Sequence, residues 1–263
     1  MAAQAESRQK LVYEVYAGGI HAVQATLDID VLKTGRYDLV LDAHTRGFLA
    51  SLVPWDGTFE SHGWVLNGER FQPEQHKSTT QWRENVDVKD YHYNKDGSFK
   101  TLTVTDDHST SVREVEKDLV DHTTDVLSAT LQVLNDYSQS GKCDGASEVV
   151  DGKRRFEQSF QHQKMVEFEA NKYNIFSGSA AECIVEVTPV AGAWNKKPRG
   201  WLSIQEQGRA RNMMPTVWIG RLSENGPAVP VKIRVKTAYG TLFMHLAEYR
   251  NGKDVRVAEK RVK

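Results

Sequence analysis

Alternating apolar and polar residues between short glycine turns constrain this chain more than any other feature of its sequence. The clearest stretch is 23–31, where valine, alanine, leucine and isoleucine occupy every second position and glutamine, threonine and aspartate fill the others. In a β-strand these two sets point to opposite sides, one buried and one in water. The stretch 231–236 alternates in the same way. Both patterns predict strands with one buried side.

Tight turns separate the predicted strands. Asn67-Gly68, Asp96-Gly97 and Asp151-Gly152 are pairs that favour two-residue hairpins. Short connections favour antiparallel neighbours, because a parallel pair needs a long crossover. We expect loops at 106–122, 171–180 and 191–199. We expect strands at 11–17, 23–31, 37–45, 58–66, 71–83, 87–94, 99–105, 149–150, 154–168, 182–190, 201–206, 217–222, 231–236 and 242–249.

One segment predicts a helix among these strands. Leu127, Leu131 and Leu134 repeat at three- and four-residue steps, which places them on one stripe. Thr124 or Asp125 can cap its start, and Gly141 can end it. We therefore predict an all-β, mainly antiparallel fold: a strongly curved sheet, open β-barrel or β-spiral wrapped around one central α-helix. Residues 10–263 form a single domain, since no linker or repeat divides them.

Composition and charge exclude several classes of protein. The chain has 263 residues, of which 39% are hydrophobic and 26% charged, and a net charge of −1. This charge gives no general attraction to nucleic acid. No apolar run is long enough to span a bilayer. Basic residues gather near the C-terminus, and two interpretations are open: a solvated strand and tail, or a tail that binds phosphate. These residues are Arg250, Lys253, Arg256, Lys260, Arg261 and Lys263.

The N-terminus and the cysteines favour an exported protein. Ala3-Gln4-Ala5 has the small-x-small pattern that precedes signal-peptide cleavage, so residues 1–9 are expected to be a disordered remnant of that region; an ordinary disordered leader is the alternative. Cys143 and Cys183 are the only two cysteines. In an exported chain such a pair favours a disulfide, and in a cytosolic chain two buried thiols.

Several blocks resemble the bacterial domain of unknown function 3108 family. The stretch 11–20 resembles the opening of that family, and 125–134 resembles its helix. The later blocks occur in the same order: Cys143-Asp-Gly, Asp151-Gly-Lys-Arg-Arg-Phe, Cys183, and Pro230-Val-Lys-Ile followed by Tyr239-Gly240. The resemblance covers about residues 10 to 249.

This resemblance carries expectations of its own. The family implies no established enzyme activity. Its fold is similar to that of periplasmic lipoprotein carriers of the LolA and LolB kind, in which a curved antiparallel sheet around a helix leaves an apolar cavity. The paired cysteines look most like those of alphaproteobacterial members, which are exported to the periplasm. A likeness of fold is weak support for a function.

The sequence contains no catalytic or metal-binding motif. His62 with His76, or His92 with His108, can converge across strands, but no metal-ligand spacing of histidines occurs. Asp106-Asp107-His108 is explained equally well as a cation site or a polar loop. There is no Gly-x-Ser-x-Gly elbow or phosphate-binding glycine loop. We expect no cofactor, and a hydrolase is the minor alternative.

An apolar segment offers a ligand surface instead. We select Phe48, Leu49, Leu52, Trp55 and Trp64 as candidate ligand-binding residues, because an apolar segment at the mouth of a curved sheet can close over an acyl chain. Filling of the core is the alternative for each. The row Lys232, Arg234 and Lys236 can meet lipid phosphate or an acidic partner, or can simply face solvent.

The combined interpretation is a non-catalytic periplasmic protein of the cell envelope. It binds or carries a lipid, a lipoprotein or another amphipathic ligand. The alternative is an envelope-integrity scaffold that acts through contacts with other envelope proteins.

Overall fold

The computed structural model describes residues 8–106, 109–224, 226–237 and 240–261. Ala3-Gln4-Ala5, Asp107, His108 and Tyr239 lie outside them. The strands are β1 (Gln9–Ala17), β2 (Ile20–Leu32), β3 (Arg36–Thr45), β4 (Trp55–Leu66), β5 (Arg70–Trp82), β6 (Asn85–Tyr93), β7 (Phe99–Asp106), β8 (Ser109–Arg113), β9 (Gly145–Val150), β10 (Arg154–Phe168), β11 (Gly178–Gly192), β12 (Thr216–Arg221), β13 (Ala228–Thr237), β14 (Gly240–Asn251) and β15 (Asp254–Val257). The helices are α1 (Gly47–Leu52), α2 (Lys117–Val120), α3 (Val126–Ser140) and α4 (Trp201–Ala210).

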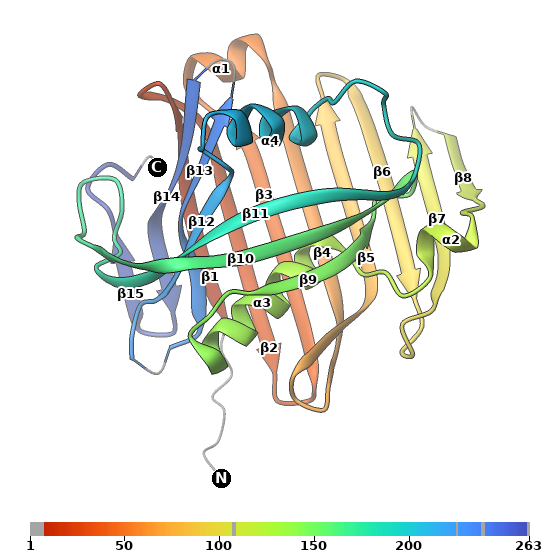
Figure 1. The fold of residues 1–263 in the computed structure, drawn as a ribbon, viewed down its shortest axis with the longest axis horizontal. Coiled ribbons are helices and arrows are strands. Elements are labelled where there is room, and N and C mark those ends of the chain that lie inside the picture. Colours follow the sequence, from red (N-terminus) through yellow and green to blue (C-terminus); the bar gives the residue numbers. More distant parts are fainter. Residues whose placement is uncertain (1–7, 107–108, 225, 238–239, 262–263) are drawn as a thin grey trace.

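All of these strands belong to one curved antiparallel sheet. Its order is β8-β7-β6-β5-β4-β3-β2-β1-β14-β13-β12-β11-β10-β9, with β15 paired to β14. The sheet is not closed, because β8 and β9 lie at opposite ends of this path. Figure 1 shows β9, β10 and β11 running across the front of the strands β1 to β5. The prediction of a mainly antiparallel, curved all-β sheet is therefore confirmed.

The helix α3 packs against the sheet beside β9 (Figure 1). It contacts β4, β5, β9, β10 and β13. Its Leu131 joins the main core, together with Leu11, Tyr37 and Leu246. Val133 and Leu134 join a second cluster, which surrounds the two cysteines. Leu131 and Leu134 of the predicted apolar stripe are thus buried, and Leu127 is partly buried against the main core.

The predicted turns are confirmed where the structure describes them. Asn67-Gly68, Asp96-Gly97 and Asp151-Gly152 join β4 to β5, β6 to β7, and β9 to β10. Gly63 has a different role, at a register shift between β4 and β5. A Cβ atom there would lie 2.1 Å from the carbonyl oxygen of Gln72, so only glycine lets the two backbones approach.

Two expectations about local structure are wrong. Residues 201–206 belong to helix α4 instead of a strand, and Gln205 and Gly208 are its buried residues. Strand β8 occupies part of the expected loop 106–122; it is polar because it is an exposed edge strand. The apolar segment before Pro54 forms the short helix α1, none of whose residues is buried.

The start of the folded region also differs from the expected boundary. Gln9 is only 2% exposed and begins β1, where it pairs with Ile29 and Asn251. The fold therefore begins inside the expected 1–9 remnant, whose first seven residues the structure does not describe.

Candidate functional site

A buried polar cluster joins the start of α3 to the sheet. Asp125 is the residue before the helix, and its Oδ1 accepts hydrogen bonds from the backbone N–H groups of Leu127 and Ser128, each at 2.9 Å. Its Oδ2 accepts from Ser61 Oγ of β4 at 2.8 Å and from Ser128 Oγ at 2.6 Å. Asp125 is therefore the helix cap, and it is also a tertiary anchor.

These hydrogen bonds offset the cost of burying a carboxylate. Asp125 is 1% exposed. A buried charge is tolerated only when hydrogen bonds or opposite charges replace water, and the four donors above do so. Burial and then the charge of Asp125 raise the pKa of the Tyr37 hydroxyl, which contacts Ser128 Oγ at 2.6 Å. The cluster thus keeps Tyr37 neutral and hydrogen-bonded at physiological pH.

His76 completes the cluster from β5. Its Nδ1 atom lies 3.4 Å from Oδ1 of Asp125, and this nitrogen has no hydrogen-bond partner among the residues that the structure describes. Neither Ser61 nor Ser128 contacts a histidine nitrogen within the described residues; both hydroxyls bond to the carboxylate instead. Activation of a serine usually needs a base that takes its proton directly. The polar cluster instead holds the start of α3 against β3, β4 and β5.

A pocket of about 620 Å³ opens beside this cluster. Ser128 lines it, so the buried network reaches the pocket wall. The rest of the lining mixes carboxylates and amides with the apolar surface of Phe71, Ala129 and Ala146. The lining residues come from the β4–β5 turn, the β6–β7 turn, the segment before α3, α3 itself and β9; they include Glu69, Asp96, Thr123, Gln132, Asp136 and Glu148. This pocket therefore offers both polar and apolar surface to a small molecule.

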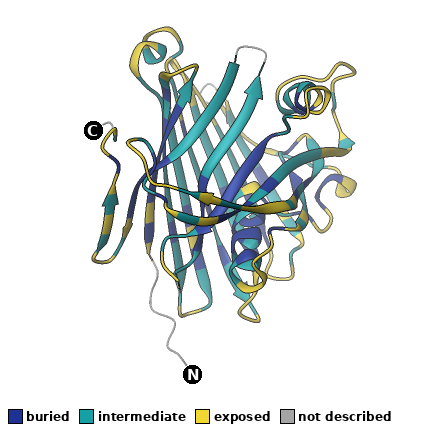
Figure 2. Cartoon of the chain, turned by 60° about the vertical axis from the view of Figure 1, so that its left-hand side comes forward, coloured by how far each residue is buried: buried dark blue, intermediate teal, exposed yellow. Residues whose placement is uncertain are grey.

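Partly buried apolar residues lie elsewhere on the same side of the sheet, several of them packed against the main core. We call this the helix-facing side, because Tyr37 and Ser61 point from it to α3. By strand alternation and register, further apolar side chains point to this side, and several are only half-buried: Val23, Leu27, Leu41, Ala43, Phe59, Ile233 and Met244. Figure 2 shows the corresponding upper strand segments in the intermediate class, whereas buried residues gather around α3.

The structure brings together only part of the predicted ligand-binding set. Phe48, Leu49 and Leu52 lie in α1, next to β2 and β3, and Trp55 follows at the start of β4. Phe48 and Leu52 are 71% and 56% exposed. Trp64 lies near the opposite end of β4. The rise per residue of a β-strand puts it roughly 30 Å from Trp55. There it stacks under the guanidinium of Arg36 at 5.1 Å.

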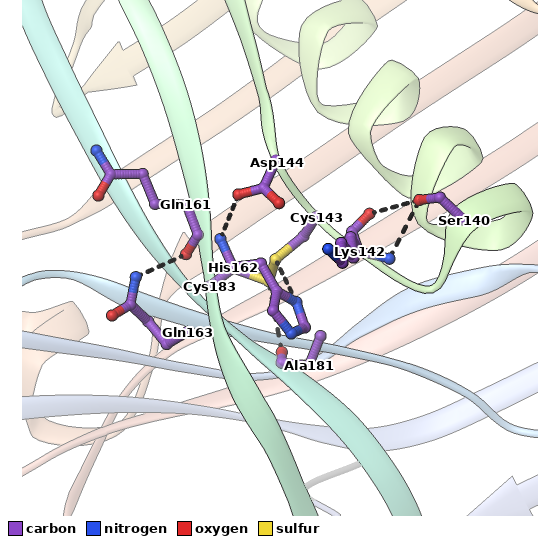
Figure 3. The surroundings of a disulfide bond; sticks show 9 residues. All are labelled: Ser140, Lys142, Cys143, Asp144, Gln161, His162, Gln163, Ala181 and Cys183. Atoms are coloured by element: carbon purple, nitrogen blue, oxygen red, sulfur yellow. Dashed lines mark hydrogen bonds between the residues drawn. A yellow bond between two sulfur atoms is a disulfide. The ribbon is translucent and has the colours of Figure 1, made fainter.

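A disulfide joins Cys143 to Cys183, as predicted. Cys143 follows the end of α3 and Cys183 lies in β11, so the bond ties the helix to the crossing strands (Figure 3). Both residues are 0% exposed. The ring of His162 lies beside them, with Nδ1 at 3.8 Å from the Sγ atom of Cys143.

The expected histidine pairs do not form a metal site in the described part of the chain. His62 pairs with Gln75 and Ser61 pairs with His76, so the two histidines lie on opposite sides of the sheet. Residue 108 is not described. The described residues contain no group of three histidine, cysteine or acidic side chains placed to hold a metal ion. No helix in them is long and apolar enough to cross a membrane.

Comparisons with known proteins identify a structure with a similar fold and the family of this chain. The chain is similar to the crystal structure of a beta-barrel-like protein of the domain of unknown function DUF1849 from Brucella abortus, with a TM-score of 0.53 and 9% sequence identity. The match covers 95% of this chain and 100% of that one, and it shows a shared fold. No curated protein matches by sequence. The family model described as "Protein of unknown function (DUF3108)" matches residues 12–247. The chain therefore belongs to the DUF3108 family.

Proposed function

We propose that this protein is a non-catalytic component of the periplasmic cell envelope that binds or carries an amphipathic ligand. In this proposal the curved sheet, wrapped around α3 as its central helix, holds the apolar part of the ligand. A lipid or a lipoprotein acyl chain has the required chemistry. The residues of α1 and Trp55 lie at the rim, where they can close over the ligand.

The half-buried apolar residues of the helix-facing side carry the proposal. Leu41 on β3 pairs with Leu27 on β2 and with Phe59 on β4, so apolar side chains continue across neighbouring strands. All three are only half-buried. Contiguous apolar surface that stays in contact with water is unfavourable, and a ligand that covers it removes this cost. Lipid sites need little more than such a surface and a few orienting groups.

The pocket beside α3 supports the polar half of the proposal. Its volume of about 620 Å³ falls in the range of small-molecule sites. Gln132 and Ser128 line it but are already hydrogen-bonded to Phe71, Asp136 and Asp125, whereas the Thr124 hydroxyl of the lining has no hydrogen-bond partner among the described residues. An amphipathic ligand has a polar end of this size as well as an apolar chain.

The buried disulfide supports the assignment to the periplasm. Disulfides persist in oxidising compartments and are uncommon in the reducing cytosol. Cys143 and Cys183 are both buried in a packed cluster, which suits a structural bond. Export of the chain is thus part of the proposal.

A scaffold that contacts other envelope proteins is the second candidate. The observation that favours it is the open edge of the sheet at β8, where Val112 is 72% exposed. An unpaired edge strand can add a strand from a partner. In this case the protein acts through protein contacts, and the apolar helix-facing side needs no ligand.

Lysine substitutions on the two sides of β3 test the first candidate. Binding of a fluorescent sixteen-carbon fatty acid is measured for Leu41→Lys and for its matched control Val40→Lys, a neighbour that points to the other side of the sheet. We expect at least tenfold weaker binding for L41K and unchanged binding for V40K. Leu41→Ser replaces L41K if lysine prevents folding. A site on the helix-facing side would be refuted if the folded Leu41 variant bound the fatty acid as tightly as wild type and V40K do.

A further inference from the structure

The side of the sheet opposite α3 carries a separate group of basic and aromatic residues. We call it the outer side. Ile233 pairs with Met244 on the helix-facing side, so the next pair, Lys232 and His245, points outward. Trp218 on β12 pairs with Lys232 and extends the row. This outer row therefore crosses β12, β13 and β14.

Aromatic rings surround the Lys232 amine. Its Nζ atom lies 5.2 Å from the ring centre of Phe243, 5.4 Å from that of Trp218 and 5.7 Å from that of Phe168. Electron-rich ring faces attract a cation, but they carry no net negative charge. The amine is thus held in place while its positive charge is not neutralised.

A second cation lies beside it. The guanidinium carbon of Arg234 is 5.3 Å from the ring centre of Trp218, and its Nη2 donates to Thr216 Oγ1 at 2.9 Å. Among the described ion pairs, none involves Lys232 or Arg234. Burial and then the charge of Arg234 lower the pKa of Lys232, as expected where like charges meet without a counter-ion.

Hydrogen-bonding groups in the row also lack partners. Trp218 is 6% exposed, yet its Nε1 donor has no acceptor among the described residues. In the same part of the chain, the Nε atom of Arg234 and the Nδ1 atom of His245 are also buried without a hydrogen-bond partner. Buried N–H groups are nearly always paired in folded proteins, so two unpaired donors beside two uncompensated cations call for an explanation.

Two acidic side chains lie on the same side of the sheet as the row. Glu14 on β1 pairs across the strands with His245. Its carboxylate is bound by His21, by Gln24 Nε2 at 2.9 Å and by Arg261 Nη1 at 3.3 Å. Glu182 lies across from Trp218 on β11. Neither carboxylate forms an ion pair with Lys232 or Arg234 among the described ion pairs, so the two cations of the row have no paired counter-ion.

We infer that three residues of the outer side, Trp218, Lys232 and Arg234, bind an oxyanion, with phosphate as the chemical class. A phosphate group accepts several hydrogen bonds and binds favourably to guanidinium and ammonium groups. Lys232 and Arg234 leave the rings to contact it, and the Trp218 indole N–H becomes accessible when they move. Both free phosphate and the phosphodiester of a lipid head group have this chemistry.

This inference is independent of the proposed apolar site. The outer row lies on the opposite side of the sheet from Leu41 and Phe59. Loss of fatty-acid binding in L41K leaves the row intact, and loss of oxyanion binding in the variants below leaves the helix-facing side intact. The two sets of experiments therefore succeed or fail separately.

Titration with inorganic phosphate, followed by NMR, tests the inference on the whole chain. The probe is the indole N–H cross-peak of Trp218, assigned by its absence from Trp218→Phe, with sodium chloride at matched ionic strength as the reference. We expect a saturable shift with phosphate and none with chloride. Lys232→Gln and Arg234→Gln should each weaken binding at least tenfold. Lys236→Gln is the matched control, since Lys236 lies on the same side of β13 and contacts none of these rings.

Vesicle sedimentation separates the two sources of phosphate. Phosphatidylglycerol vesicles are compared with phosphatidylcholine vesicles for wild type, K232Q and K236Q. Saturable binding of free phosphate without sedimentation supports a soluble phosphate compound. Sedimentation with phosphatidylglycerol that K232Q abolishes and K236Q retains supports a lipid head group. The inference is overturned if neither probe binds, or if K232Q, R234Q and K236Q behave alike in both assays.

Discussion

The hydroxyl of Tyr37 on β3 lies 2.6 Å from the hydroxyl of Ser128 on α3, and both groups are buried. The two residues are 91 positions apart in the sequence. Through Ser128 the contact reaches Asp125, which caps the helix and also bonds Ser61 on β4. One polar cluster thus sets the position of α3 on the helix-facing side, next to the pocket and the apolar surface.

Replacing Asp125 with alanine should destabilise the protein strongly. The change removes a helix cap, worth about 1 kcal/mol, and leaves buried serine hydroxyls without their acceptor, at roughly 1–3 kcal/mol more. We therefore expect the free energy of unfolding in urea to fall by about 2–4 kcal/mol. Asp38→Ala is the control, because Asp38 is exposed, and should change it by less than about 0.5 kcal/mol. Equal effects of the two changes would mean that the cluster does not hold the helix.

Loss of the disulfide should cost about 4 kcal/mol. Cys143 and Cys183 are 40 positions apart, and closing a loop of that length lowers the entropy of the unfolded chain by this amount. The measurement compares urea unfolding of the wild type, with and without reductant, and of the double variant Cys143→Ser, Cys183→Ser. Alkylation without reductant should leave both cysteines unlabelled. Labelling of both in exported protein would contradict the bond and remove its support for the periplasm.

The C-terminal Arg261 should matter for stability although the sequence suggested a solvated tail. Its guanidinium binds Glu14 at 3.3 Å and Glu248 at 3.0 Å, and these carboxylates are almost fully buried. Arg261→Ala leaves them short of a partner, so we expect a loss of about 2–3 kcal/mol in urea unfolding. Lys260→Ala, whose side chain is exposed, is the adjacent control. A loss as small as that of the control would show that the tail is dispensable.

His245 should make stability depend on pH between about 6.5 and 4. Burial and then the charge of Lys232 lower its pKa from 6.5 to about 4. The unfolded chain binds a proton at a higher pH than the folded protein, so this contribution is complete above pH 6.5 and is lost as the pH falls towards 4. Because the ring is partly exposed, we expect only about 1 kcal/mol at pH 5.

The matching measurement is urea unfolding at pH 7.5 and pH 5 for wild type and His245→Gln. The variant should lose about 1 kcal/mol less than wild type over this interval. Glu14, which pairs across the strands with His245, is present in both proteins, so only the histidine differs between them. Identical losses in the two proteins would mean that the histidine is not desolvated in the fold.

Local patterns in the sequence predicted the local structure well. The alternation of 23–31 and the pairs Asn67-Gly68 and Asp151-Gly152 act within one strand or turn, and they gave β2 and the hairpins. The leucine stripe gave α3. The segment 201–206 was mistaken for a strand because its helix is fixed from a distance: the Gln205 side chain bonds both backbone groups of Val187.

The candidate sites depended on distant contacts and were harder to predict. Asp125 was one of two candidates for the cap, with Thr124, but its partner Ser61 is 64 positions away and carries no local signal. Trp55 and Trp64 were assigned to one apolar surface at the mouth of the sheet, but the length of β4 separates them. The row Lys232, Arg234 and Lys236 was correctly placed on one side of a strand, while the rings around Lys232 come from β10, β12 and β14.

Native mass spectrometry of the protein isolated from a bacterial envelope tests the central claim most directly. We predict that the wild type and Val40→Lys carry a co-purified lipid or acyl-bearing molecule and that Leu41→Lys does not. Wild-type protein that repeatedly carries no such ligand, while a specific envelope protein co-purifies with it, would contradict the claim and favour the scaffold.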